Sequence, residues 1–93
     1  MEIKKLINDL GLQDKKVTDE DLDTYTVTLE NSDEYVKVYS TIGKLEGFDL
    51  DYENMICNEH KCVMPYLTDD WDVTLNADYD KDIYIVTIEE AKE

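Results

Sequence analysis

The sequence predicts an α+β fold in which an N-terminal amphipathic helix packs on an antiparallel sheet of about five or six strands. Two patterns lead to this prediction. Apolar residues first recur at the three- and four-residue spacing of a helix, at Ile3, Leu6, Ile7 and Leu10. From Thr24 onward, apolar and polar residues alternate at the two-residue period of strands. Packing the helix on the sheet gives each amphipathic element a partner for its apolar face.

The helix is expected to span about residues 2–10. Gly11 stands where a left-handed C-terminal cap belongs, and Leu12 is expected to fold back onto the helix, as in a Schellman motif. Residues 13–22 are polar and lack a sustained period, which predicts a connection, with a helical turn at "TDED" as an additional option.

Six strands are predicted, at about residues 23–30, 35–42, 48–57, 62–67, 71–78 and 82–90. The first two read as a hairpin, because the intervening "NSDE" has the composition of a turn. Pro65 lacks an N–H donor and predicts a sheet edge or a strand end. The neighbouring apolar residues from Ile83 to Val86 predict that the last strand is central and covered on both faces. At 93 residues the chain is expected to form a single domain, residues 1–93.

The charge balance is strongly acidic: 24 Asp and Glu residues face nine lysines, there is no arginine, and the net charge is −15. Such a field repels nucleic acid and anionic lipid and attracts cationic protein surfaces or divalent ions. The sequence lacks both an apolar run of membrane-spanning length and the apolar block of a signal peptide, so we expect a cytoplasmic protein. No cofactor is predicted.

The acids gather in short rows that predict a partner-binding surface. On a strand, residues i and i+2 share a face about 6.6–6.8 Å apart, close to two steps of about 3.4 Å in a DNA strand. A basic groove that holds nucleic acid would be attracted to such rows. The alternative is solvation and turn chemistry, although a net charge of about 2–8 already serves solubility in a small domain. The predicted contacts are Asp49, Asp51, Glu53, Asp69, Asp70, Asp72, Asp78, Asp80 and Asp82, with Trp71 as an apolar anchor.

In size, acidity and lack of catalytic motifs, the chain resembles the small phage-encoded inhibitors that mimic DNA. These include anti-CRISPR proteins and inhibitors of restriction enzymes or nucleases. The resemblance covers the composition of the whole chain and no motif, so it assigns no functional residue. It implies an inhibitor that acts in the host cytoplasm by occupying the basic groove of a nucleic-acid-binding protein, such as an RNA-guided nuclease.

Two groups of residues resemble metal sites. The run from Asp78 to Glu89 approaches a calcium-loop template, but Ile83 stands where the loop needs glycine. Cys57, His60 and Cys62 are weak candidates for a zinc site, with a disulfide or free thiols as alternatives. No constellation singles out a nucleophile or an acid–base pair, so no enzyme is predicted. A divalent-metal-binding domain and a structural or assembly protein remain the alternatives to mimicry.

Overall fold

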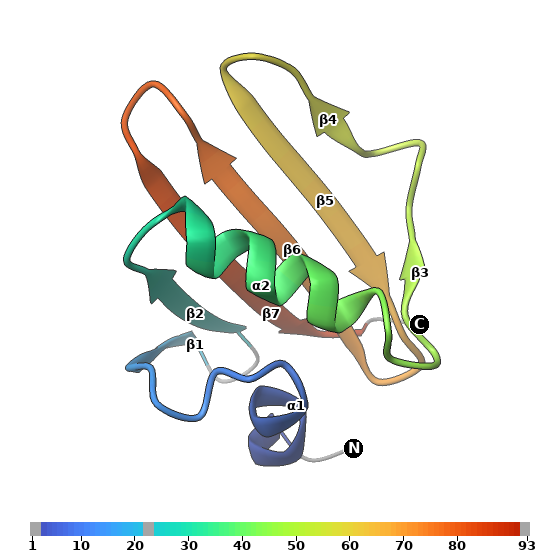
Figure 1. The fold of residues 1–93 in the computed structure, drawn as a ribbon. Coiled ribbons are helices and arrows are strands. Elements are labelled where there is room, and N and C mark those ends of the chain that lie inside the picture. Colours follow the sequence, from blue (N-terminus) through green and yellow to red (C-terminus); the bar gives the residue numbers. More distant parts are fainter. Residues whose placement is uncertain (1–2, 22–23, 92–93) are drawn as a thin grey trace.

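A computed structural model of the chain describes residues 3–21 and 24–91. Within these residues the chain forms two helices and seven strands (Figure 1). In chain order they are α1 (Ile3–Asp9), β1 (Val17–Asp21), β2 (Thr24–Leu29), α2 (Ser32–Ile42), β3 (Asp49–Leu50), β4 (Ile56–Cys57), β5 (Lys61–Leu67), β6 (Trp71–Asp78) and β7 (Ile83–Glu90). The ends of the predicted elements at residues 2 and 23 lie outside the described residues.

All the strand pairs are antiparallel, in the order β1-β2-β7-β6-β5-β3, and β4 pairs with the other end of β5. The predicted α+β class and the central position of the last strand are therefore confirmed. The expectation that β7 is covered on both faces is wrong. Tyr84, Val86 and Ile88 are buried, whereas Ile83 is 43% exposed. α2 lies across one face of the sheet only (Figure 1), so Ile83 and Ile85 belong to an open face.

The end of α1 follows the predicted Schellman motif. Gly11 has a φ of +75°, and the Gly11 N–H donates to the Asn8 carbonyl at 3.0 Å. The Leu12 N–H donates to the Ile7 carbonyl at 2.9 Å, which is the long-range bond of this motif. Leu12 is 2% exposed and joins the core, so the cap turns the chain back onto the protein.

The predicted strand at 35–42, and with it the predicted hairpin, is wrong: this segment is α2. Asn31 is the N-cap and its side chain accepts from the Glu34 N–H at 3.0 Å. Glu34 in turn accepts from the Glu30 N–H at 2.7 Å, an arrangement close to a capping box. The motif "NSDE" therefore begins a helix. An ion pair and hydrogen bond from Lys15 lowers the pKa of the Glu34 carboxyl and ties the preceding connection to α2.

Removal of this cap should destabilise the fold measurably. We expect Asn31→Ala to lower the free energy of unfolding by about 1 kcal/mol, because the Glu34 N–H loses its acceptor. Urea denaturation of the wild type and the variant measures the difference. Asn31→Asp keeps a capping oxygen and should stay near wild type; equal losses in both variants would contradict the assigned N-cap.

Two further strand predictions need correction. The connection predicted at 13–22 contains β1, an edge strand that pairs with β2. The strand predicted at 48–57 is broken into β3 and β4, because five residues, 51–55, stand against only Met64 and Pro65 of β5. The Asp51 N–H donates to the Pro65 carbonyl at 2.8 Å. Pro65 has no N–H and cannot donate a second hydrogen bond to this segment. The pairing with β5 is therefore weakest between β3 and β4.

One hydrophobic core lies between the helices and the covered face of the sheet. α2 contributes Tyr35, Val38 and Ile42, at helical spacing. The other buried apolar residues are Leu6, Leu10, Leu12, Val27, Leu29, Cys62, Met64, Tyr66, Val73, Leu75, Ala77, Tyr84, Val86 and Ile88. No helix in the described part of the chain is long and apolar enough to cross a membrane.

Candidate acidic binding site

The predicted acidic contacts do not form one surface, because the hairpins place them at opposite ends of the sheet. Asp69, Asp70 and Asp72 lie at the β5–β6 turn and the start of β6. Asp78 ends the same strand, and Asp80 follows in the β6–β7 turn. The seven residue steps from Trp71 to Asp78 correspond to about 23 Å at the usual rise of a strand. The two groups therefore cannot act as one continuous row.

Strand register builds an acidic row that the along-strand spacing did not predict. Asp72 of β6 is the partner of Glu89 of β7, and on its other side it is the partner of Leu67 of β5. Leu67 is in turn the partner of Asp49 of β3. Residues in register share one face of a sheet, with neighbouring strands about 4.7–4.9 Å apart. Asp49, Asp72 and Glu89 therefore stand in one line on the open face; we call them the acidic row.

The acidic row is not neutralised by its surroundings. None of its three carboxylates makes an ion pair with a cation in the described part of the chain. Lys44 lines the same pocket as Asp49 without an ion pair to it, whereas Lys61 starts β5 and Lys81 lies in the β6–β7 turn, both at the far end of the sheet. Directly opposed like charges, such as Asp72 and Glu89, cost up to about 1 kcal/mol in a sheet. The fold thus keeps a locally unfavourable arrangement on an accessible surface.

The ladder predicted at Asp49, Asp51 and Glu53 does not form. Asp49 lies in β3, but Asp51 leaves the strand and its carboxylate accepts from the Asn54 amide at 2.6 Å. Glu53 lies in the turn that follows and is exposed. The physical reason is the break between β3 and β4, which removes the two-residue period from this segment. Only Asp49 of the three belongs to the acidic row.

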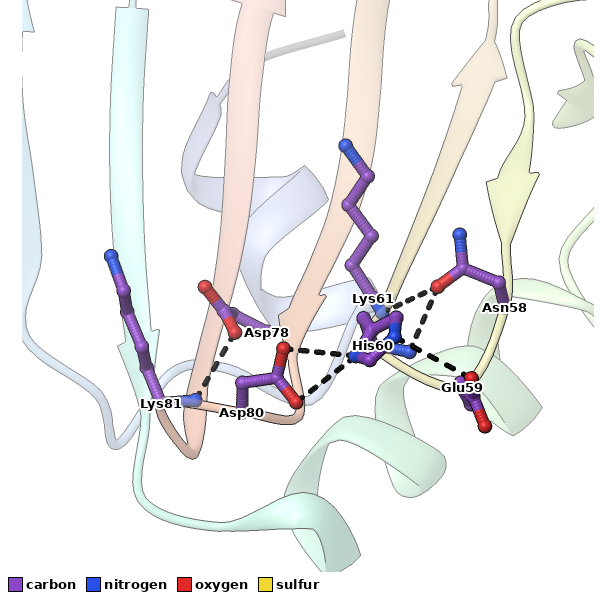
Figure 2. A network of polar contacts seen from close by, with 7 residues as sticks. All are labelled: Asn58, Glu59, His60, Lys61, Asp78, Asp80 and Lys81. Carbon is purple, nitrogen blue, oxygen red and sulfur yellow. Dashed lines mark hydrogen bonds and ion pairs between the residues drawn. The ribbon is translucent and has the colours of Figure 1, made fainter.

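At the opposite end of the sheet, the aspartates hold turns together (Figure 2). Asp78 accepts from the Lys81 N–H at 3.1 Å. Asp80 places its two oxygens 3.0 and 3.2 Å from His60 Nδ1, and the Tyr79 N–H donates to the His60 carbonyl at 2.9 Å. The β4–β5 and β6–β7 turns are therefore joined side by side. Asp82 has a φ of +54°, a conformation that Asp tolerates in turns. Local turn chemistry explains these three acids.

Trp71 packs within the protein and is not an exposed anchor for a partner. Its ring meets Tyr25 edge to face, with centroids 6.1 Å apart and an interplanar angle of 66°. It is partly buried and packs against the core. Such aromatic pairs stabilise by about 0.5–1.5 kcal/mol beyond the buried area. The turn before Trp71 is shaped by Thr68, whose hydroxyl accepts from the Trp71 N–H at 2.8 Å and sets where Asp69 and Asp70 stand.

Beside the acidic row, the open face carries a row of threonines. Thr18, Thr26, Thr87 and Thr74 are successive partners across β1, β2, β7 and β6. Threonine pairs of this kind support a sheet through hydroxyl contacts. The open face therefore presents hydroxyls next to carboxylates, and a bound cation or amide could use both.

The predicted set of Cys57, His60 and Cys62 does not form a metal centre. His60 directs Nδ1 to Asp80 and has Nε2 3.5 Å from Glu59 (Figure 2). Cys57 is exposed and Cys62 is buried, and both are free thiols. Among the described residues, no three His, Cys, Asp or Glu side chains are arranged to hold a metal ion. The Cys57, His60 and Cys62 set and the calcium-loop aspartates therefore do not form such a site.

Sequence reasoning missed Glu89, which belongs to the acidic row, and Glu90, the register partner of Trp71. A signal was present, because Glu89 continues the outward period of Thr87 along the last strand. The charge is also distributed unevenly. Residues 46–91 hold thirteen acids and two lysines, whereas residues 1–45 hold ten acids and six lysines. The excess of negative charge is therefore greatest in the part of the chain from β3 onward.

No protein-family model, curated protein or solved structure matches this chain. The resemblance to phage-encoded inhibitors stays a prediction from size and composition.

Proposed function

We propose that this chain is an acidic, non-enzymatic inhibitor or binding protein that mimics the charge of nucleic acid. Its partner is a basic nucleic-acid-binding protein, such as an RNA-guided nuclease, and its place of action is the cytoplasm, that of the host cell if the chain is phage-encoded. The observation that carries the proposal is the acidic row Asp49, Asp72 and Glu89, which is accessible and lacks a described cationic partner.

The electrostatics of the row support association with a cationic groove. Opposed carboxylates repel each other in the free protein, so a cation that binds between Asp72 and Glu89 relieves an existing cost. The uneven charge of residues 46–91 would also steer a basic partner toward the sheet. Charge supports the proposal, whereas a match to phosphate spacing does not, because the predicted ladder at residues 49–53 is broken.

An assembly function has one observation in its favour. Ile56, Leu67 and Ile83 are 45%, 41% and 43% exposed, and their register places them on the open face. An apolar contact through this face would bury them and would be largely insensitive to salt, whereas groove binding should weaken as salt rises. Salt dependence therefore separates the two functions.

The experiment is a capture from bacterial lysate at low salt, with bound proteins identified by mass spectrometry and eluted by salt or by duplex DNA. We expect a basic nucleic-acid-binding protein that DNA displaces. The triple variant Asp49→Asn, Asp72→Asn, Glu89→Gln should lower its capture about 10-fold or more, because steering by charge changes association rates on that scale. The variant should stay folded, since it removes a like-charge pair.

The matched control removes three charges away from the open face. Asp9→Asn, Asp14→Asn and Glu46→Gln change α1, the connection after it and the loop after α2. Equal loss of capture in both triple variants would show that net charge matters and not the acidic row. Capture that neither salt nor DNA reverses would count against mimicry and in favour of assembly.

A further inference from the structure

A cavity of about 270 Å³ lies between the N-terminal half of α2 and the β4–β5 hairpin. Three sulfur-bearing side chains line it, those of Cys57, Cys62 and Met64, together with Tyr35 and Tyr79. Cys62 and Met64 are 3% and 8% exposed, whereas Cys57 is exposed. The cavity thus has a sulfur-lined interior with one thiol toward solvent.

Strand register brings the two thiols together. The Asn58 N–H donates to the Lys61 carbonyl at 2.8 Å, so the adjoining partners Cys57 and Cys62 form the next, non-hydrogen-bonded pair of the antiparallel ladder. In such pairs the Cα atoms are about 4.5 Å apart and the side chains are at their closest. The two cysteines therefore lie side by side on the face of the hairpin that lines the cavity.

Met64 follows Cys62 by two residues and therefore points to the same face of β5. Its unbranched side chain turns easily about three bonds, so the thioether can adapt to a bound ion. The side chains of Tyr35 and Tyr79 line the same cavity, so two phenol groups share this space with the three sulfur atoms.

We propose that Cys57, Cys62 and Met64 form a three-sulfur site for a soft monovalent metal ion, with Cu(I) as the ion that fits the ligands best. Thiolate and thioether ligands select Cu(I), whereas zinc favours four ligands of nitrogen, oxygen or thiolate sulfur. His60, the residue that would extend the set toward zinc, contacts Asp80 instead. The strongly negative chain favours the approach of a cation.

Binding exchanges protons for metal without any change in oxidation state. The Cys57 and Cys62 S–H bonds break, two protons pass to the buffer, and two S–Cu bonds form; the Met64 thioether donates a lone pair. Because both thiols must lose a proton before they bind the metal, the apparent affinity should increase with pH. The site is independent of the acidic row.

The test is an anaerobic titration of the reduced protein with Cu(I) in competition with the chelator bathocuproine disulfonate. We expect one Cu(I) per chain and sulfur-to-copper charge-transfer absorption in the ultraviolet. Cys57→Ser should lower the affinity at least about 100-fold, since even loss of outer partners of a ligand costs about 10- to 100-fold. Cys57 is exposed, so this variant should fold, which circular dichroism verifies.

Met64→Leu keeps the side-chain volume and should weaken Cu(I) binding about 10-fold. Met55→Leu is the matched control, because Met55 does not line the cavity, and it should leave the affinity unchanged. The proposal is overturned if Cys57→Ser binds as tightly as the wild type, or if Met64→Leu and Met55→Leu have equal affinities. Preferential binding of Zn²⁺ with no effect of Met64→Leu would overturn the assignment of the ion.

Discussion

Tyr35→Ala is expected to lower the free energy of unfolding by about 3–5 kcal/mol, the usual cost of deleting a buried aromatic side chain. Tyr35 is 5% exposed, packs against Tyr84 with ring centroids 5.8 Å apart, and attaches α2 to the sheet. Its hydroxyl donates toward the carbonyl oxygens of Leu75 and Cys62, at 3.3 and 3.5 Å. Small domains have only about 5–15 kcal/mol of stability, so this single change should bring the chain close to unfolding.

Urea denaturation followed by circular dichroism measures the loss, and two controls fix its meaning. Tyr39→Ala removes the same side chain from a position 47% exposed and should change stability by no more than about 0.5 kcal/mol. Val38→Ala should destabilise clearly more than Val36→Ala, because the helix buries Val38 and leaves Val36 56% exposed. On a strand both valines would share one face, so equal losses would contradict α2.

Sequence patterns predicted an element correctly where the period of its apolar residues matches the side chains that the fold buries. The alternation of residues 73–78 matches the burial of β6, and Gly11 ends α1 as its position indicates. Residues 35–42 failed because tyrosine, valine and threonine favour strands by composition. The need to cover the sheet outweighed that preference. The decisive signal was the Asn31 and Glu34 cap, which also has the composition of a turn.

The candidate site was less predictable than the fold. The sequence indicates which strands carry acids, but only pairing shows which acids meet. Asp72 and Glu89 are 17 positions apart and become neighbours through the register of β6 and β7. Asp49 and Asp51 are close in sequence and separate because five residues must fit against two on β5. Spacing along the chain predicts neither the meeting of Asp72 with Glu89 nor the separation of Asp49 from Asp51, since both depend on the lengths of turns and bulges.

The Cys57 and Cys62 pair also shows that contacts between side chains depend on the fold. The sequence left them as weak zinc candidates, with a disulfide or free thiols as alternatives, and the register of β4 and β5 pairs them. Only the structure shows that Met64 lines the same cavity as the two cysteines and that His60 contacts Asp80 at the turn. The proposed site therefore takes a thioether as its third ligand, while the His60 imidazole, which zinc motifs favour, contacts Asp80.

The second large effect is expected at alkaline pH: stability should fall steeply above about pH 9–10. Burial raises the pKa of Tyr35 and raises the pKa of Cys62 to about 11, so both groups stay protonated in the folded chain after they have ionised in the unfolded chain. The unfolded state then binds fewer protons, and the free energy of unfolding decreases as pH rises. Each such group contributes about 1.4 kcal/mol per pH unit between its two pKa values.

The pKa of Lys15 is raised by its contact with Glu34, so the stabilisation from this ion pair is also present below the unfolded lysine value and lost above it. Lys15 thus acts in the same direction as Tyr35 and Cys62, and the two buried groups alone should bring the loss to about 3–4 kcal/mol by pH 11. Urea denaturation at pH 7, 9, 10 and 11 measures it. Tyr35→Phe keeps the ring but cannot ionise, so its disadvantage at pH 7, about 1 kcal/mol for the lost hydroxyl contacts, should shrink above pH 10. Parallel curves for the wild type and Tyr35→Phe would show that the buried phenol does not drive alkaline unfolding, and would place the loss on Cys62 and Lys15.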